Sequence, residues 1–236
     1  MGALVRAGAS EGSALIRVCA VAVDELRMSG AVVSLMTPLE ARQAQSATIA
    51  AASNETSRSV EEIEFSVGEG PGMDAFLSSR PVLTPDLEET FARWPGYVPA
   101  ALEAGVRATF AFPMLVGAAR FGVLHLHSTD VRVLTSDDTA TSLLLAELAT
   151  ELVLDVYSPL DGHAASPDLA PFDLDGHRDE VYQAQGMVMV QLGVSLEGAL
   201  ARMRAHAFAS DQQLAQVAAD ILAGRTLLQH DPEGAP

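Results

Sequence analysis

Residues 107–127, RATFAFPMLVGAARFGVLHLH, carry the clearest structural pattern in this chain. Two β-rich runs, 107–116 and 120–127, flank the short connection Gly117-Ala118-Ala119. A short connection that contains glycine between two such runs is typical of a β-hairpin. His125 and His127 alternate along the second run, so both are expected on one face of the sheet. We therefore expect an antiparallel sheet built around this hairpin.

Further strands and helices are expected on both sides of the hairpin in sequence. Strands are predicted at 31–36, where Pro38 ends the strand, within 46–52 and at 81–83. Helices are predicted at 13–28, 57–65, 73–79, 100–104 and 136–157. The last of these has an apolar stripe of Leu144, Leu145, Leu148, Leu152 and Val156. This order predicts an α+β fold, an antiparallel sheet with helices packed on one face.

A change of composition separates the remaining chain. Residues 158–175 hold three of the twelve prolines, several acids and no periodic apolar pattern, so they are predicted to be a linker. Three short helices follow, with Ser195 capping the second and Asp211 capping the third. The predicted domains are therefore 10–157 and 176–228, joined by the linker 158–175.

Charge and cysteine content limit the range of functions that the chain can have. The net charge is −17 and all 14 basic residues are Arg, so any nucleic-acid binding requires a local patch. The single cysteine, Cys19, excludes an intrachain disulfide, and its apolar neighbours favour a buried thiol over a redox sensor. With no secretory signal and no apolar run of about 20 residues, a cytoplasmic protein without membrane contact is expected.

The C-terminal helices carry a dispersed sequence pattern over roughly residues 178–222. Its elements are Ala184-Gln185-Gly186-Met187-Val188-Met189, Gly193-Val194-Ser195, Ala199-Leu200, Met203-Arg204, Ala207, Leu214, Val217-Ala218 and Ile221. In order and spacing this pattern resembles the ANTAR family of RNA-binding antitermination regulators. The resemblance implies a three-helix module that binds structured RNA stem-loops and regulates transcription by antitermination.

The preceding domain has several characteristic stretches. They are Phe65–Ala75, which includes Gly68-Glu69-Gly70-Pro71-Gly72, then Arg80-Pro81-Val82, Pro113 and Phe121-Gly122-Val123-Leu124. With these stretches the domain resembles GAF domains of the kind often fused to ANTAR. The resemblance implies a signal-sensing domain that takes a small-molecule ligand or forms a homodimer.

Two departures from the ANTAR pattern affect the expected RNA site. Gln185 stands where the family usually has a basic residue, and Asp211-Gln212-Gln213 stand where it often has Asn and basic residues. Since RNA affinity depends on cations near phosphates, fewer of them weaken binding. The residues implied for RNA contact are Arg178, Gln185, Arg204, Gln212 and Gln213. The alternative hypothesis is that they lie on an exposed helix face and have no role in RNA binding.

Candidate ligand-binding and catalytic residues are few in the first domain. The glycine-dense loop 68–72 lacks the Lys, the Ser/Thr and the strand–loop–helix context of a phosphate-binding loop, so we interpret it as a tight turn. If a ligand pocket exists, its bulky residues are expected to be Phe65, Phe76, Trp94 and Phe110. No catalytic signature is present, so an enzyme is not expected. No cofactor and no metal site are predicted, since no Cys or carboxylate cluster adjoins His125 and His127 in sequence.

Three functions therefore remain open. The first is a signal-responsive antitermination regulator that binds RNA. The second is a ligand-sensing or dimerisation protein whose three-helix module contacts a protein partner, with RNA binding reduced or lost. The third is an enzyme or metal-binding protein built on the first domain.

Overall fold

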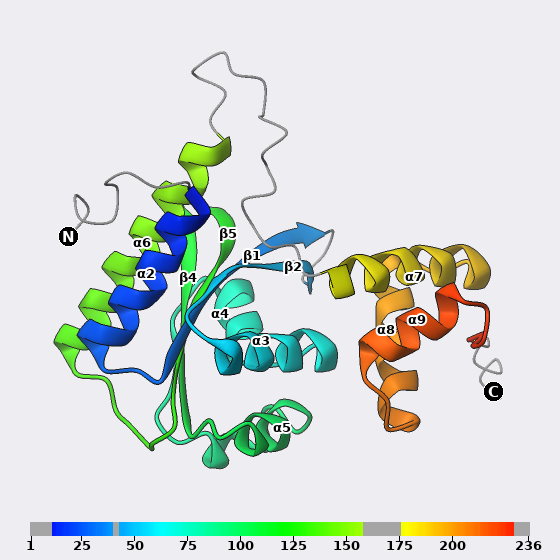
Figure 1. The fold of residues 1–236 in the computed structure, drawn as a ribbon, viewed down its shortest axis with the longest axis horizontal. Coiled ribbons are helices and arrows are strands. Elements are labelled where there is room, and N and C mark those ends of the chain that lie inside the picture. Colours follow the sequence, from blue (N-terminus) through cyan, green and yellow to red (C-terminus); the bar gives the residue numbers. More distant parts are fainter. Residues whose placement is uncertain (1–10, 40–42, 158–175, 229–236) are drawn as a thin grey trace. The chain divides into compact units, whose positions relative to one another are not determined.

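The computed structural model describes residues 11–39, 43–157 and 176–228. The chain divides into two units, Met1–Asp173 and Leu174–Pro236 (Figure 1). The linker predicted at 158–175 lies outside the described residues. Among the helices described, none is both long enough and apolar enough to cross a lipid bilayer.

The first unit is built on a five-stranded antiparallel sheet. Its strands lie in the order β2-β1-β5-β4-β3. Their bounds are β1 Gly30–Leu39, β2 Gln43–Ala52, β3 Val82–Thr84, β4 Ala108–Val116 and β5 Ala119–Ser128. The predicted hairpin is confirmed as β4–β5. Pro38 does not end β1 as predicted, because a register shift between Thr37 and Pro38 accommodates it within the strand.

Helices cover both faces of this sheet (Figure 1). On one face lie α2 (Glu11–Leu26) and α6 (Ser136–Tyr157), which pack on β1 and β4. On the other lie α3 (Glu55–Val67) and α4 (Pro71–Ser78), with α5 (Tyr97–Glu103) packed against α3. The predicted α+β class is therefore confirmed, whereas the prediction of helices on one face is wrong. The reason is that consecutive residues of β4 and β5, which point to opposite faces of the sheet, are buried. Helices therefore have to pack on both faces.

The core of the α2–α6 face is apolar. Its strand residues include Val33, Phe110, Phe112, Met114, Leu124 and Leu126. Cys19 of α2 is buried among them, and burial raises the pKa of its thiol to about 12, as expected of a structural thiol. In α6 the buried stripe includes Leu145 and Leu152, whereas Leu144 is 58% exposed. Leu144 is therefore a surface residue, because one residue along a helix turns the side chain away from the stripe.

The polar features of the opposite face depend on how α3 begins and ends. The Asn54 side chain accepts a hydrogen bond from the Ser57 amide at 2.9 Å and caps the first turn. Gly68 ends the helix in the left-handed conformation, with φ at 77°. These two caps fix the helix between them and thereby set which of its side chains point at the sheet.

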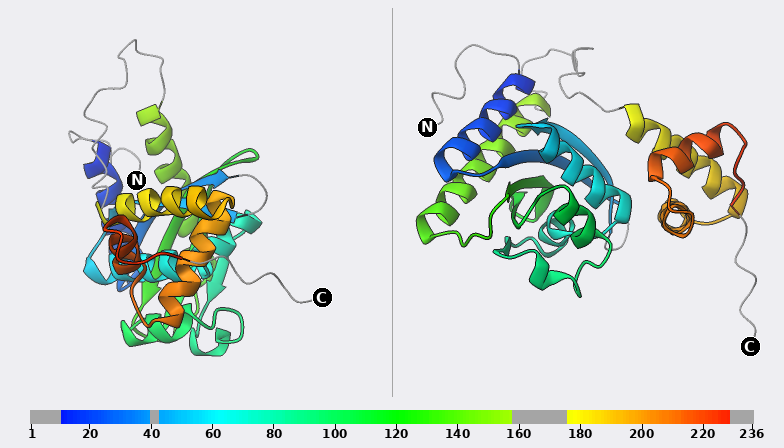
Figure 2. Two further views of the ribbon diagram at one scale, coloured as in Figure 1. Left: turned by 90° about the vertical axis from the view of Figure 1, so that its right-hand side faces the viewer. Right: turned by 60° about the horizontal axis from the view of Figure 1, so that its bottom comes forward.

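The second unit consists of α7 (Gly176–Leu192), α8 (Leu196–Ala209) and α9 (Leu214–Leu222), which pack on one another (Figure 2). The Ser195 hydroxyl accepts a hydrogen bond from the Gly198 amide at 3.0 Å, so its predicted cap is confirmed. The predicted cap by Asp211 is wrong. Asp211 has a φ of 53° just after the end of α8, and the N-cap position of α9 belongs to Gln213.

Two Gly→Ala substitutions test the fold with opposite expected signs. A Cβ on Gly122 of β5 would lie 1.9 Å from the Ser34 carbonyl oxygen of β1, so Gly122→Ala forces two paired strands apart. We expect it to lower the free energy of unfolding of the first unit by about 3 kcal/mol. A Cβ on Gly186 of α7 meets open space, so Gly186→Ala is expected to stabilise the second unit by about 1 kcal/mol. Chemical denaturation of both variants measures this, and a Gly122→Ala variant as stable as the parent would contradict the described strand register.

Candidate functional site

A group of buried polar side chains lies between α3 and the sheet. Glu61 and Glu64 are one turn apart on α3, and both face His125 of β5. The Nδ1 atom of His125 lies 3.6 Å from the Oε2 atom of each carboxylate. All three side chains are at most 3% exposed. We call these three residues the Glu–Glu–His cluster.

Sequence reasoning missed this cluster because it looked for carboxylates near His125 along the chain. The fold brings them from a helix some sixty residues earlier. A signal was nevertheless present, since the segment 57–65 was predicted to be helical. Two glutamates three residues apart on a helix share a face, and burial of that face would point both at the sheet.

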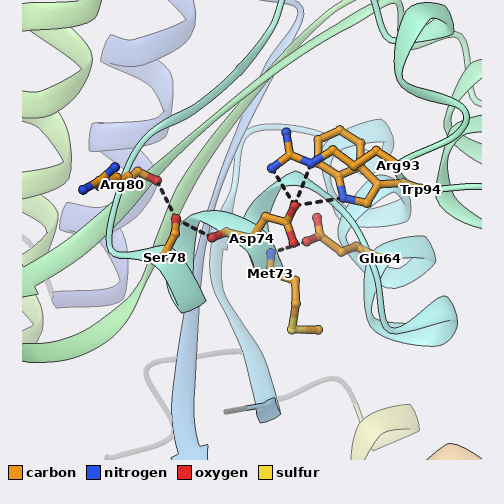
Figure 3. A network of polar contacts seen from close by, with 7 residues as sticks. All are labelled: Glu64, Met73, Asp74, Ser78, Arg80, Arg93 and Trp94. Carbon is orange, nitrogen blue, oxygen red and sulfur yellow. Dashed lines mark hydrogen bonds and ion pairs between the residues drawn. The ribbon is translucent and has the colours of Figure 1, made fainter.

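The glycine-dense loop holds the carboxylate of Glu64. Its Oε1 atom accepts a hydrogen bond of 2.5 Å from the Met73 amide in the first turn of α4 (Figure 3). A Cβ on Gly70 would lie 2.7 Å from Glu64 Cδ, and one on Gly72 would lie 3.1 Å from Glu64 Oε1. The loop therefore needs glycine for a close approach to a carboxylate of the protein itself, and it is more than the tight turn that the sequence suggested.

A second carboxylate fastens the segment that follows β3 onto α4. Asp74 Oδ2 accepts hydrogen bonds from Arg93 Nε at 2.9 Å and from Trp94 Nε1 at 3.2 Å (Figure 3). The Arg93 guanidinium also lies over the Trp94 ring, 4.6 Å from its centroid. Trp94 is thus held in place at both its polar and its aromatic parts.

The four aromatic residues predicted near a ligand do not form one group. Phe65, Phe76 and Trp94 belong to α3, to α4 and to the segment that Asp74 fastens, and all three are buried. Phe110 is also buried, but it lies in the α2–α6 core on the other face of the sheet. Strand alternation explains this, because Phe110 follows Thr109, which faces the α3 side and contacts His125.

Burial and the neighbouring charges shift the pKa values of the cluster. Burial, with a contribution from Glu61, raises the pKa of Glu64 to about 7 against the opposing effect of His125. Burial by itself would lower the pKa of His125, but Glu61 and Glu64 outweigh it and raise that pKa above its ordinary value. Burial and both carboxylates raise the pKa of Tyr97 well above 10, so its hydroxyl lies within their electrostatic reach.

His127, the second histidine of the strand, has a different environment. Its Nε2 atom lies 2.9 Å from the Ser57 hydroxyl, and burial lowers its pKa to about 4. A Cβ on Gly30 would lie 2.3 Å from this nitrogen, so glycine is required beside it on β1. His127 is therefore a neutral residue that joins α3 to the sheet at neutral pH.

The residues predicted to contact RNA have unequal exposure. Arg178 and Gln185 of α7 are buried, and Gln185 Nε2 donates a hydrogen bond of 2.7 Å to the Leu196 carbonyl oxygen at the start of α8. Arg204 of α8 is half-buried, and burial lowers the pKa of its guanidinium to about 10. Gln212 and Gln213, between α8 and α9, are exposed.

Other surface residues of the second unit bear on RNA binding. Arg225 forms an ion pair with Asp220, with 2.6 Å between Nη2 and Oδ1. Phe208, which stands one turn after Arg204 on α8, is 88% exposed. An aromatic ring in solvent on a helix surface is unusual for packing and is suited to stacking. Phe208 is not among the residues that the sequence pattern implied for RNA contact.

Comparison with known proteins gives each unit a family. Residues 9–153 match the GAF domain family, and residues 176–222 match the ANTAR domain family. No curated protein matches the sequence significantly. The solved structures similar to the first unit share its fold at low sequence identity.

Three of these solved structures are GAF domains. One, from a Coxiella burnetii phosphoenolpyruvate-protein phosphotransferase, is 14% identical with a TM-score of 0.52 and covers 66% of this chain and 89% of its own. The GAF domain of the Acinetobacter phosphoenolpyruvate-protein phosphotransferase is 12% identical with a TM-score of 0.50, covering 66% and 89%. The cyanobacteriochrome TePixJ GAF domain is 16% identical with a TM-score of 0.50, covering 65% and 94%.

The fold and the matches define a regulatory protein in which a sensory domain precedes an output domain. The chain belongs to the GAF domain family and carries a C-terminal ANTAR domain, so the predicted GAF–ANTAR architecture is confirmed. GAF domains are signal-sensing modules and ANTAR domains are linked to RNA binding and antitermination. Neither is an enzymatic class.

The buried position of Gln185 leads to a test of its role. Gln185→Leu keeps the size of the side chain but leaves the Leu196 carbonyl oxygen without its donor. We expect the second unit to lose about 1–2 kcal/mol of stability. Gln212→Leu, a matched change at an exposed position, should alter stability by less than about 0.5 kcal/mol. Urea unfolding of both variants measures this, and equal effects would show that the hydrogen bond contributes nothing.

Proposed function

We propose that this protein is a signal-responsive regulator of transcription antitermination that binds RNA stem-loops through α7–α9. The observation that carries the proposal is the ANTAR match over residues 176–222, all of them within the three helices and their connections. The GAF domain supplies the signal input, on the α3–α4 side of its sheet. A cytoplasmic location is part of this proposal.

The exposed end of α8 and the connection to α9 form the proposed RNA-binding surface. It comprises Arg204, Phe208, Gln212 and Gln213. The pKa of Arg204, at about 10, leaves its guanidinium charged at neutral pH, so it provides a cation for a phosphate. The Phe208 ring offers a stacking surface for an unpaired base of a loop. The two glutamine amides donate and accept hydrogen bonds with base edges.

Gln185 and Arg178 have a supporting place in this proposal. Gln185 occupies the family position usually held by a basic residue, but its amide bonds to the start of α8. Arg178 is buried at the start of α7. Gln185 therefore acts on RNA binding by holding α7 against the start of α8, and the direct contacts come from α8 and the α8–α9 connection.

Gel-shift titration with an RNA of two short stem-loops tests the proposal. We expect full-length protein to bind with a shallow salt dependence, a slope of log K against log salt of about −1 to −2, because few cations reach phosphates. Phe208→Ala should weaken binding by roughly 5- to 100-fold through lost stacking. Gln213→Arg should strengthen it by about 5-fold through one added phosphate contact.

The control is Phe91→Ala, which removes an exposed aromatic ring of the GAF domain and should leave RNA affinity unchanged. Absence of any shift at low salt, with or without cell extract, would refute RNA binding. Such a result would favour a protein partner for the exposed apolar residues of this unit, namely Met187, Val190, Leu196, Phe208 and Leu227.

We further propose that the protein is a homodimer that associates through the outer surfaces of α2 and α6. Ile16 of α2 and Leu143 and Leu144 of α6 are 53%, 44% and 58% exposed. Apolar side chains on two neighbouring helices are characteristic of a helix-mediated interface.

Light scattering after size-exclusion chromatography tests the dimer. Leu144→Glu places a charge in the proposed interface and should convert the dimer to a monomer, because charged residues are disfavoured at interface cores. Phe91→Glu, the same type of change at another exposed apolar position of the GAF domain, should leave the dimer intact. A monomeric parent protein at micromolar concentration would exclude this interface.

A further inference from the structure

The Glu–Glu–His cluster has the donor set and the spacing of a metal site. We propose that Glu61, Glu64 and His125 bind one divalent transition-metal ion of the Zn²⁺, Fe²⁺ or Mn²⁺ type between α3 and β5. This inference goes beyond RNA binding and gives the GAF domain a bound inorganic ion.

The distances suit a common centre. One donor atom from each of the three side chains can be chosen so that all lie within 4.8 Å of one another, and His125 Nδ1 is 3.6 Å from Oε2 of both glutamates. Zinc binds imidazole nitrogen and carboxylate oxygen at about 2.0–2.2 Å. Tetrahedral ligands at that range stand roughly 3.4 Å apart. The two separations of 3.6 Å lie within the range of an ion pair and are also close to those of ligands around one ion.

Charge balance favours the same occupant. Two carboxylates that are at most 3% exposed are costly to bury as anions without compensation. A divalent ion with two carboxylates and a neutral imidazole gives a net charge of zero. Without an ion, the same balance requires both a protonated histidine and a protonated Glu64, whose pKa burial raises to about 7.

Unpartnered atoms provide an independent observation. Within the part of the chain that the structure describes, His125 Nδ1 and Glu64 Oε2 are buried and have no hydrogen-bond partner. These are the two atoms that face each other at 3.6 Å. Buried polar atoms are seldom left unsatisfied, so their convergence indicates a ligand between them.

In metal sites, the ligand atoms that do not bind the ion usually form hydrogen bonds with neighbouring groups. The same holds here for His125 and Glu64. His125 Nε2 bonds to the Thr109 hydroxyl, which itself lies 3.4 Å from the Leu126 carbonyl oxygen. When Thr109 donates to that carbonyl it accepts the Nε2 proton, which leaves the Nδ1 lone pair directed at the carboxylates. Glu64 Oε1 is held by the Met73 amide, which leaves Oε2 for the ion.

The donor set selects the class of ion. One imidazole and two carboxylates suit Zn²⁺, Fe²⁺ and Mn²⁺, whereas Ca²⁺ requires six to eight oxygen ligands. Three protein ligands leave a fourth coordination position open for a small ligand. The ligands belong to α3 and to the central part of the sheet, so the ion would join these two elements.

Metal content of the full-length protein tests the site. Because the cluster is buried, the ion is supplied during expression. The media are supplemented with Zn²⁺, Fe²⁺ or Mn²⁺ in turn, and a medium supplemented with Mg²⁺ is the negative control. Mass spectrometry of the desalted protein should find about one ion per chain for at least one of the first three. Glu61→Gln and His125→Gln should each lower the retained metal at least 10-fold, since each removes a ligand.

The matched control is His127→Gln, which changes a buried histidine two residues away on the same face of β5 and should retain the metal. X-ray absorption of the metal-loaded parent protein gives a second readout that does not depend on the folding of any variant. It should show only nitrogen and oxygen ligands, with the scattering of one imidazole. A parent protein free of all three metals, metal retained by both ligand variants, or a spectrum without imidazole would each overturn the proposal.

Discussion

The hydrogen bond between the Glu64 carboxylate and the first turn of α4 is the contact on which the rest of the GAF domain's α3–α4 side depends. It joins three elements, because the same carboxylate extends from α3, receives the Met73 amide of α4 and faces His125 of β5. Gly70, with a φ of 155° and room for no Cβ beside Glu64, allows the backbone to come this close, and Gly72 eases the approach. Asp74, the next residue after Met73, then fastens Arg93 and Trp94 over α4. The arrangement of this face therefore follows from where one buried carboxylate sits.

The sequence predicted the elements well because their signals are local. The β4–β5 hairpin, the Ser195 cap and the helical periodicities each depend on residues within about four positions of one another. The errors came where a long-range contact overrides a local rule. Pro38 stays within β1 because its neighbour strand shifts register, and Phe110 leaves the expected ligand side because strand alternation places it opposite Thr109. The Glu–Glu–His cluster could be predicted only in part, since the spacing of Glu61 and Glu64 was visible but their pairing with His125 is a product of topology.

In the ANTAR domain, the residues of the family pattern have two different roles, helix packing and RNA contact, which the sequence alone does not distinguish. The family pattern correctly predicted three helices, yet it could not distinguish a residue needed for packing from one needed for RNA. Gln185 shows why: its position at the α7–α8 contact gives a long polar side chain a backbone carbonyl to bind, whether that side chain is cationic or not. By contrast, Gln212 and Gln213 lie in a connection whose backbone is fixed by the left-handed Asp211, so their side chains are exposed. The amide side chains that remain for recognition are therefore those of the α8–α9 connection.

The acidic character of the chain has different consequences in the two domains. In the ANTAR domain, excess negative charge at the surface weakens RNA attraction over distances of roughly a Debye length, so recognition must rely on short-range stacking and hydrogen bonds. In the GAF domain, two of the acids are placed inside, where no solvent screens them and a compensating charge has to be local. A single histidine compensates one of these two charges, and the other is removed either by protonation of Glu64, whose pKa burial raises to about 7, or by a bound cation. Since unsatisfied atoms on His125 and Glu64 face each other there, the electrostatic requirement and the hydrogen-bond requirement point to the same missing partner, a doubly charged ion.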